Sequence, residues 1–140
     1  MEKTLSNFKN KNSHLFFDGQ IYDAYSLLKD IFAKSEKEIV MIDNYMDKQL
    51  LDILSRIEKN IIVVTNQYNN QDYDKYKKQY HNIELKINND IHDRFIIIDR
   101  RKLYHCGASF KDLGKKCFAI SEIEDEDYLG RLVEYIGLRD

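Results

Sequence analysis

Apolar residues recur along this chain at two different spacings, which predict helices alternating with strands. Residues three and four positions apart, such as Tyr22, Tyr25, Leu28 and Phe32, mark amphipathic helices, while short β-branched runs mark buried strands. The helices predicted in this way cover 21–33, 48–57, 73–80 and 128–136, and the strands cover 39–42, 61–64, 83–87, 95–98, 102–106 and 118–123. Segment 73–80 is expected to be exposed, and 83–87 to be an outer strand because its apolar and polar residues alternate.

This order of elements predicts an α/β fold with a central β-sheet covered by helices on both faces. The sheet is expected to be mixed, because the tight polar turn at 99–102 makes its two flanking strands antiparallel. A chain of 140 residues with no visible linker fits one domain spanning 1–140, in which 1–14 is expected to be a disordered polar arm.

The strongest chemical signal lies around the predicted strand 95–98. His92 and Arg94 stand at its entrance and Asp99 at its exit, while the next strand carries His105. Gly107-Ala108-Ser109 follows, where a helix is expected to begin, and free N–H groups at a helix start favour a phosphate. A histidine, a cation and a carboxylate around one apolar strand favour phosphoryl transfer.

This pattern resembles the phospholipase D superfamily, whose signature is a histidine, any residue, a lysine, four residues and an aspartate, followed by Gly-Ser and an asparagine. His92, Arg94 and Asp99 match the first half in spacing, with arginine in place of lysine. Gly107-Ala108-Ser109 matches the second half with one residue inserted, and no asparagine follows within 110–114. The segments 17–25 and 107–121 are similar to single-motif domains that follow DNA-binding domains in phage antirepressor-like bacterial proteins.

The resemblance implies a phospholipase D-like fold and a metal-independent phosphodiesterase that needs no cofactor. One histidine would attack phosphorus to form a phosphohistidine, and a second histidine would protonate the leaving oxygen. Since this chain carries one motif, the resemblance implies a homodimer with two His92 residues close to the two-fold axis. A nucleic-acid phosphodiester is the favoured substrate, because the sequence shows no apolar membrane-binding surface.

Nine residues are candidates for the site, and each has an ordinary structural alternative such as a surface ion pair, a turn, a helix cap or a solvated helix face. The catalytic candidates are His92, Arg94, Asp99 and Ser109, and the substrate-binding candidates are His105, Lys111, Asn44, Tyr45 and Gly107. Asn44 and Tyr45 belong to the polar end 43–45 of a predicted strand, where ligands bind in many α/β sheets. The arginine and the missing asparagine favour a second hypothesis, a catalytically degenerate module that binds a ligand or dimerises within a regulatory protein.

Net charge and cysteine content limit the partners, the metal sites and the location that we expect. A net charge of −2 gives no overall attraction to nucleic acid, so such binding would depend on local basic patches. Cys106 and Cys117 show no metal-ligand spacing, so we expect reduced thiols, no metal site and a cytoplasmic protein. No signal peptide or membrane-spanning stretch is expected.

Overall fold

The computed structural model describes residues 13–109 and 118–138, which form a mixed β-sheet flanked by helices. The strands are β1 (Ser13–Phe16), β2 (Glu38–Ile42), β3 (Tyr45–Met46), β4 (Asn60–Thr65), β5 (Gln67–Tyr68), β6 (Ile83–Ile87), β7 (Arg94–Ile98), β8 (Lys102–Cys106) and β9 (Phe118–Ile123). The helices are α2 (Ile21–Ala33), α3 (Lys48–Leu54), α4 (Asn70–Gln79) and α5 (Glu126–Tyr135). The predicted α/β class is therefore confirmed.

Seven strands form the main sheet in the order β1-β9-β8-β7-β2-β4-β6, while β3 and β5 pair separately. Strands β2, β4 and β6 are parallel because α3 and α4 connect them as crossovers, whereas β7, β8, β9 and β1 are antiparallel to their neighbours. The predicted mixed sheet is correct, and β6 lies at its edge as expected.

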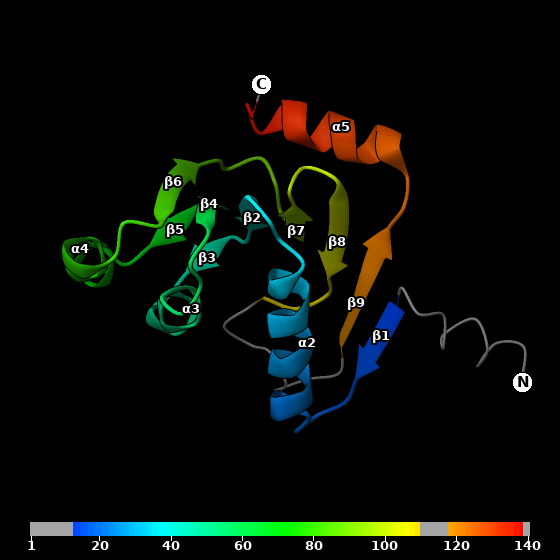
Figure 1. Ribbon diagram of the computed structural model, residues 1–140, viewed down its shortest axis with the longest axis horizontal. Helices are drawn as coiled ribbons and strands as arrows, with labels where there is room; N and C mark the ends of the chain where they lie inside the picture. The colour runs from blue at the N-terminus through cyan, green and yellow to red at the C-terminus, as the bar shows by residue number, and fades with distance from the viewer. Residues whose placement is uncertain (1–12, 110–117, 139–140) are drawn as a thin grey trace, which may run out of the picture.

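The two faces of the sheet are covered unequally. Helices α2, α3 and α4 pack on one face, where Leu28, Leu54 and Tyr76 join the larger core cluster. Helix α5 covers the other face, with Leu129 and Ile136 against Val40. Figure 1 shows α5 on the opposite side of the sheet from α2 and α3.

Several predicted details need correction. Ser13 and His14 were expected in a polar arm but begin β1, which pairs with β9. Helix α3 ends at Leu54 instead of residue 57, where the Ser55 hydroxyl bonds the Asp52 carbonyl at 2.7 Å. Helix α4 is not fully exposed, because Tyr73 and Tyr76 are buried; the side chain of Asn69 caps this helix.

None of the described helices combines the length and the apolar character that crossing a bilayer requires. The helix predicted to begin near Ser109 falls in 110–117, outside the described residues, as do Lys111 and Cys117.

Candidate functional site

The candidate site lies at one edge of the sheet, where three chain segments meet. Strand β2 ends at this edge, β7 begins there and β8 ends there, because β7 is antiparallel to both neighbours. The register pairs Ile42 with Phe95 and Arg94 with Cys106. Residues after β2, before β7 and after β8 are therefore brought together.

A buried carboxylate anchors this edge. Asp43 directly follows β2 and is only 2% exposed. The Ser109 hydroxyl lies 3.1 Å and 3.0 Å from the two carboxylate oxygens of Asp43, and the Tyr45 N–H donates to Asp43 at 3.3 Å. Ser109 is thus held inside the site, although its hydroxyl is already engaged. Asp43 belongs to the polar end 43–45, from which only Asn44 and Tyr45 were predicted to bind substrate; an acidic residue directly after a buried strand was the signal that favoured Asp43.

Arg94 is the first residue of β7, and it brings a guanidinium to this edge of the sheet. Its Nη2 donates to the Gly107 carbonyl oxygen at 3.1 Å. Its Nε is buried and has no hydrogen-bond partner among the described residues. A guanidinium with unused donor capacity is suited to an anion, because it offers several N–H groups in a rigid plane.

Cys106 of β8 is paired with Arg94 of β7 in the strand register, but its thiol is weakly nucleophilic. Burial raises the pKa of the Cys106 thiol to about 11, and the thiol donates to the Ala108 carbonyl oxygen at 3.1 Å. A protonated, buried thiol is a poor nucleophile, so the side chain acts as packing.

His92 stands exposed just before β7. Its backbone carbonyl accepts a hydrogen bond from Asn44 Nδ2 at 3.3 Å, which ties the histidine segment to the end of β2. Within the described parts of the chain, no side chain bonds to the His92 imidazole, so both ring nitrogens are open to solvent or to a ligand.

His105 lies within hydrogen-bond distance of Asp93 on the other face of the strand pair. Its Nε2 lies 2.8 Å from Asp93 Oδ2, and its ring is 5.5 Å from the Phe95 ring. Burial raises the pKa of Asp93, but the hydrogen bonds from His105 and from the Arg94 N–H lower it more, so the net shift is downward. Asp93 and Arg94 are adjacent, so their side chains extend to opposite faces of the sheet. His105 therefore lies on the face opposite the Arg94 side chain.

Asp99 is not part of this cluster. It follows β7 at the opposite end from Arg94, roughly 17 Å away at the usual rise per strand residue. Its carboxylate accepts hydrogen bonds of 2.8 to 2.9 Å from the N–H groups of Glu36, Lys37 and Glu38, and one of 3.2 Å from the Ser35 hydroxyl. The structure thus assigns Asp99 the ordinary role of a turn residue, because its acceptor oxygens are engaged by another loop.

Gly107 contributes through its backbone. Its N–H donates to the Ala119 carbonyl oxygen at 2.8 Å, and its carbonyl accepts from Arg94. A Cβ atom at this position would lie 3.2 Å from the Ala119 oxygen, so β9 passes too close for a larger residue. We therefore find Gly107 positioning Arg94, with its N–H unavailable to a substrate.

The structure therefore gathers Asp43, Asn44, His92, Arg94 and Ser109 at one edge of the sheet. Such a group can bind an anion through the guanidinium and offer an imidazole to it. Within residues 13–109 and 118–138, no three side chains of His, Cys, Asp or Glu come together as metal ligands.

Comparison with known proteins supports the fold. No protein-family model matches the sequence, and no curated protein does either. Among solved structures, NucT from Helicobacter pylori is 11% identical with a TM-score of 0.62, covering 89% of this chain and 92% of that one. The phospholipase D family member Nuc from Salmonella typhimurium is 12% identical with a TM-score of 0.64, covering 89% and 90%. TrmBL2, described as an archaeal chromatin protein with a novel mode of DNA binding, is 11% identical with a TM-score of 0.52, covering 96% and 57%. At these identities the likeness shows a phospholipase D-like fold.

Proposed function

We propose that this protein is a phosphodiesterase of the phospholipase D type that cleaves nucleic-acid phosphodiesters as a homodimer, without a metal ion. The observation that carries the proposal is the placement of His92 and Arg94 together at the start of β7, beside Asp43 and Ser109. The same fold occurs in the phospholipase D family member Nuc, and the DNA-binding chromatin protein TrmBL2 shares it.

In the proposed first step, a ring nitrogen of His92 attacks phosphorus and a P–N bond forms as the P–O bond to the leaving oxygen breaks. The leaving oxygen takes a proton from His92 of the second copy. In the second step, water attacks phosphorus, the P–N bond breaks, and the second imidazole accepts the proton of the water. The attacking imidazole is neutral, whereas the second imidazole begins as imidazolium and is neutral after it has given its proton to the leaving oxygen, so it can accept the proton of the water. Histidine suits both roles because it changes protonation state near neutral pH.

Arg94 is proposed to stabilise the charge on the phosphoryl oxygens. Its fixed contact with the Gly107 carbonyl holds the guanidinium in place before the substrate arrives, so little reorganisation is needed during the reaction. Arginine also remains charged at every relevant pH.

The homodimer follows from the single motif. His92 is exposed and has no side-chain partner among residues 13–109 and 118–138, and a second copy across a two-fold axis would supply the second imidazole. Asn44 would help by fixing the backbone of His92.

A second candidate function has its own support. Ser109 is engaged by Asp43, and the cation is an arginine where a lysine is usual in the motif. Both features suit a module that binds a phosphorylated or sugar-like ligand, or that dimerises, within a regulatory protein.

Hydrolysis of bis-p-nitrophenyl phosphate in the presence of a chelator, with His92→Ala and Arg94→Ala measured alongside, separates the two functions. We expect turnover by the native protein that His92→Ala abolishes. No turnover by a native protein that still binds inorganic phosphate through Arg94 would favour the binding module. Equal turnover by native protein and His92→Ala would refute the histidine mechanism.

A further inference from the structure

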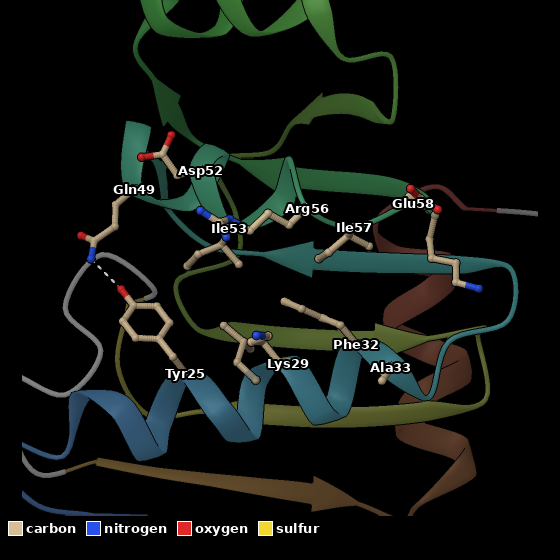
Figure 2. Close-up of a pocket in the computed structure, with 12 residues that line it drawn as sticks. Tyr25, Lys29, Phe32, Ala33, Gln49, Asp52, Ile53, Arg56, Ile57 and Glu58 are labelled. Atoms are coloured by element: carbon tan, nitrogen blue, oxygen red, sulfur yellow. Dashed lines mark hydrogen bonds between the residues drawn. The ribbon is translucent and has the colours of Figure 1, made fainter.

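A groove of about 600 Å³ separates α2 from α3, on the face of the sheet that α2, α3 and α4 cover. Figure 2 shows side chains from both helices pointing into the space between them. Along α2 the lining runs from Tyr25 to Ala33, roughly 12 Å at 1.5 Å per residue. This size falls within the range of small-molecule sites in proteins.

The walls and floor of the groove are apolar. Leu28 and Phe32 of α2 line the groove and are buried. Ile53 and Ile57 line it from α3 and the turn that follows this helix, and Figure 2 shows them opposite Phe32. Both isoleucines are only partly buried, so the groove leaves apolar surface in contact with water. Covering that surface with an apolar ligand would be favourable.

The mouth of the groove is cationic. Lys29, Arg56 and Lys59 line it, and no carboxylate of the described residues lies within ion-pair distance of any of them. In Figure 2 Lys29 and Arg56 lie midway along the length of the groove.

The acidic residues of the lining offset this charge only in part. Asp52 pairs with Lys48 at 3.2 Å, which leaves Glu58 as the other acid in the lining. The mouth therefore carries a surplus of positive charge above an apolar floor.

One end of the groove is closed by a contact between the helices. The Gln49 side-chain amide donates to the Tyr25 hydroxyl, as the dashed line in Figure 2 shows. The bond joins α2 to α3 at this end of the groove, and it offers polar groups to a ligand there.

We propose that this groove binds a small anionic amphiphile, with the apolar body on Ile53 and Ile57 and the anionic head at Lys29 and Arg56. The complementarity of charge and polarity carries the inference, which is independent of the phosphodiesterase proposal. The anionic head could be a carboxylate, a sulfonate or a phosphate, since all three pair with the same cations.

The test uses the native protein and 8-anilinonaphthalene-1-sulfonate, whose aromatic body and sulfonate report binding by fluorescence. Decanoate and decyltrimethylammonium serve as competitors with the same chain and opposite head charge. We expect saturable binding that decanoate displaces and the cationic amphiphile does not. Absence of saturable binding, or equal displacement by both competitors, would overturn the proposal.

Variants localise the binding. The double charge reversal Lys29→Glu/Arg56→Glu should weaken the binding of the probe about tenfold or more, because two favourable charges become repulsive. The matched control Lys75→Glu/Lys78→Glu places the same charge change on exposed positions of α4 and should leave binding unchanged. Ile53→Asn, checked for native far-ultraviolet circular dichroism, should also weaken binding by removing apolar floor.

Native affinity in both the double reversal and Ile53→Asn would place the probe elsewhere and overturn the proposal. Concentration-dependent self-association that Ile53→Asn abolishes would also overturn it, since a second copy of the chain would then occupy the groove.

Discussion

His105 Nε2 lies 2.8 Å from Asp93 Oδ2, directly behind the segment that carries His92 and Arg94. Asp93 also accepts the Arg94 N–H at 3.0 Å through its other oxygen. The Asp93 carboxylate thus joins β8 to the start of β7. We interpret His105 and Asp93 together as a clamp that positions Arg94.

If the clamp positions Arg94, then Asp93→Ala and His105→Ala should each raise KM for bis-p-nitrophenyl phosphate about tenfold, a cost of about 1.4 kcal/mol, with a smaller change in kcat. The double variant should be no worse than Asp93→Ala, because both single changes remove the same contact between His105 and Asp93. Steady-state kinetics of all three variants checks this. Lys102→Ala, exposed at the other end of β8, is the control and should match the native protein; additive losses in the double variant would contradict the clamp.

The bond between Asp43 and Ser109 leads to a prediction on stability. Ser109→Ala removes a donor from a buried carboxylate, so the free energy of unfolding should fall by about 1–3 kcal/mol. Urea denaturation measures this change. Ser26→Ala, a half-buried serine of α2, provides the comparison and should stay within about 0.5 kcal/mol of the native value.

Asp99 should make stability depend on acid pH. Burial raises the pKa of Asp99, but hydrogen bonds from the N–H groups of Glu36, Glu38 and Lys37 and from the Ser35 hydroxyl lower it, from 3.8 to about 2. Because the folded-state pKa is the lower one, the contribution to stability is full well above pH 3.8 and is lost as the pH falls toward 2.

Asp99→Asn keeps the shape but loses the charge, so it should lower the free energy of unfolding by about 1–2 kcal/mol at pH 7. The difference between Asp99→Asn and native protein should shrink as the pH falls from 5 to 2, because the native carboxylate becomes protonated there. Urea titrations across that range check the trend. A difference that stays constant with pH would mean that the charge of Asp99 does not stabilise the fold.

The sequence predicted most of the fold because its apolar spacing is clear. Helix α2 and strands β6, β8 and β9 have the predicted bounds, since tertiary packing follows the same apolar stripes. Strand β1 was missed because Ser13 and His14 are polar, and its main-chain pairing with β9 leaves no signal in the side chains. The burial of Tyr73 and Tyr76 was missed because the lysines and aspartates around them dominate that segment.

The site was predictable only where its residues are close in sequence. His92, Arg94 and Ser109 form a recognisable spacing, and the structure places them at one edge of the sheet. The Asp43 contact with Ser109 spans 66 positions, which no local pattern reveals. Conversely, Asp99 matched a motif by spacing, yet a five-residue strand separates it from Arg94 because strand residues extend along the chain.

Two glycines offer a final test of how tightly β9 supports the site. A Cβ atom on Gly107 would lie 3.2 Å from the Ala119 oxygen, so Gly107→Ala should push β9 away and lower the free energy of unfolding by about 1–3 kcal/mol. Gly130→Ala in α5 is the matched control, because nothing lies within 4 Å of its Cβ position. There the change should raise stability by about 0.5–1 kcal/mol, since alanine favours helix more than glycine. Thermal and urea unfolding of both variants measures this difference in stability.

Since the Gly107 carbonyl holds Arg94, Gly107→Ala should also weaken phosphate binding, while Gly130→Ala should leave it unchanged. Unaltered phosphate binding in Gly107→Ala would show that Arg94 does not depend on this carbonyl.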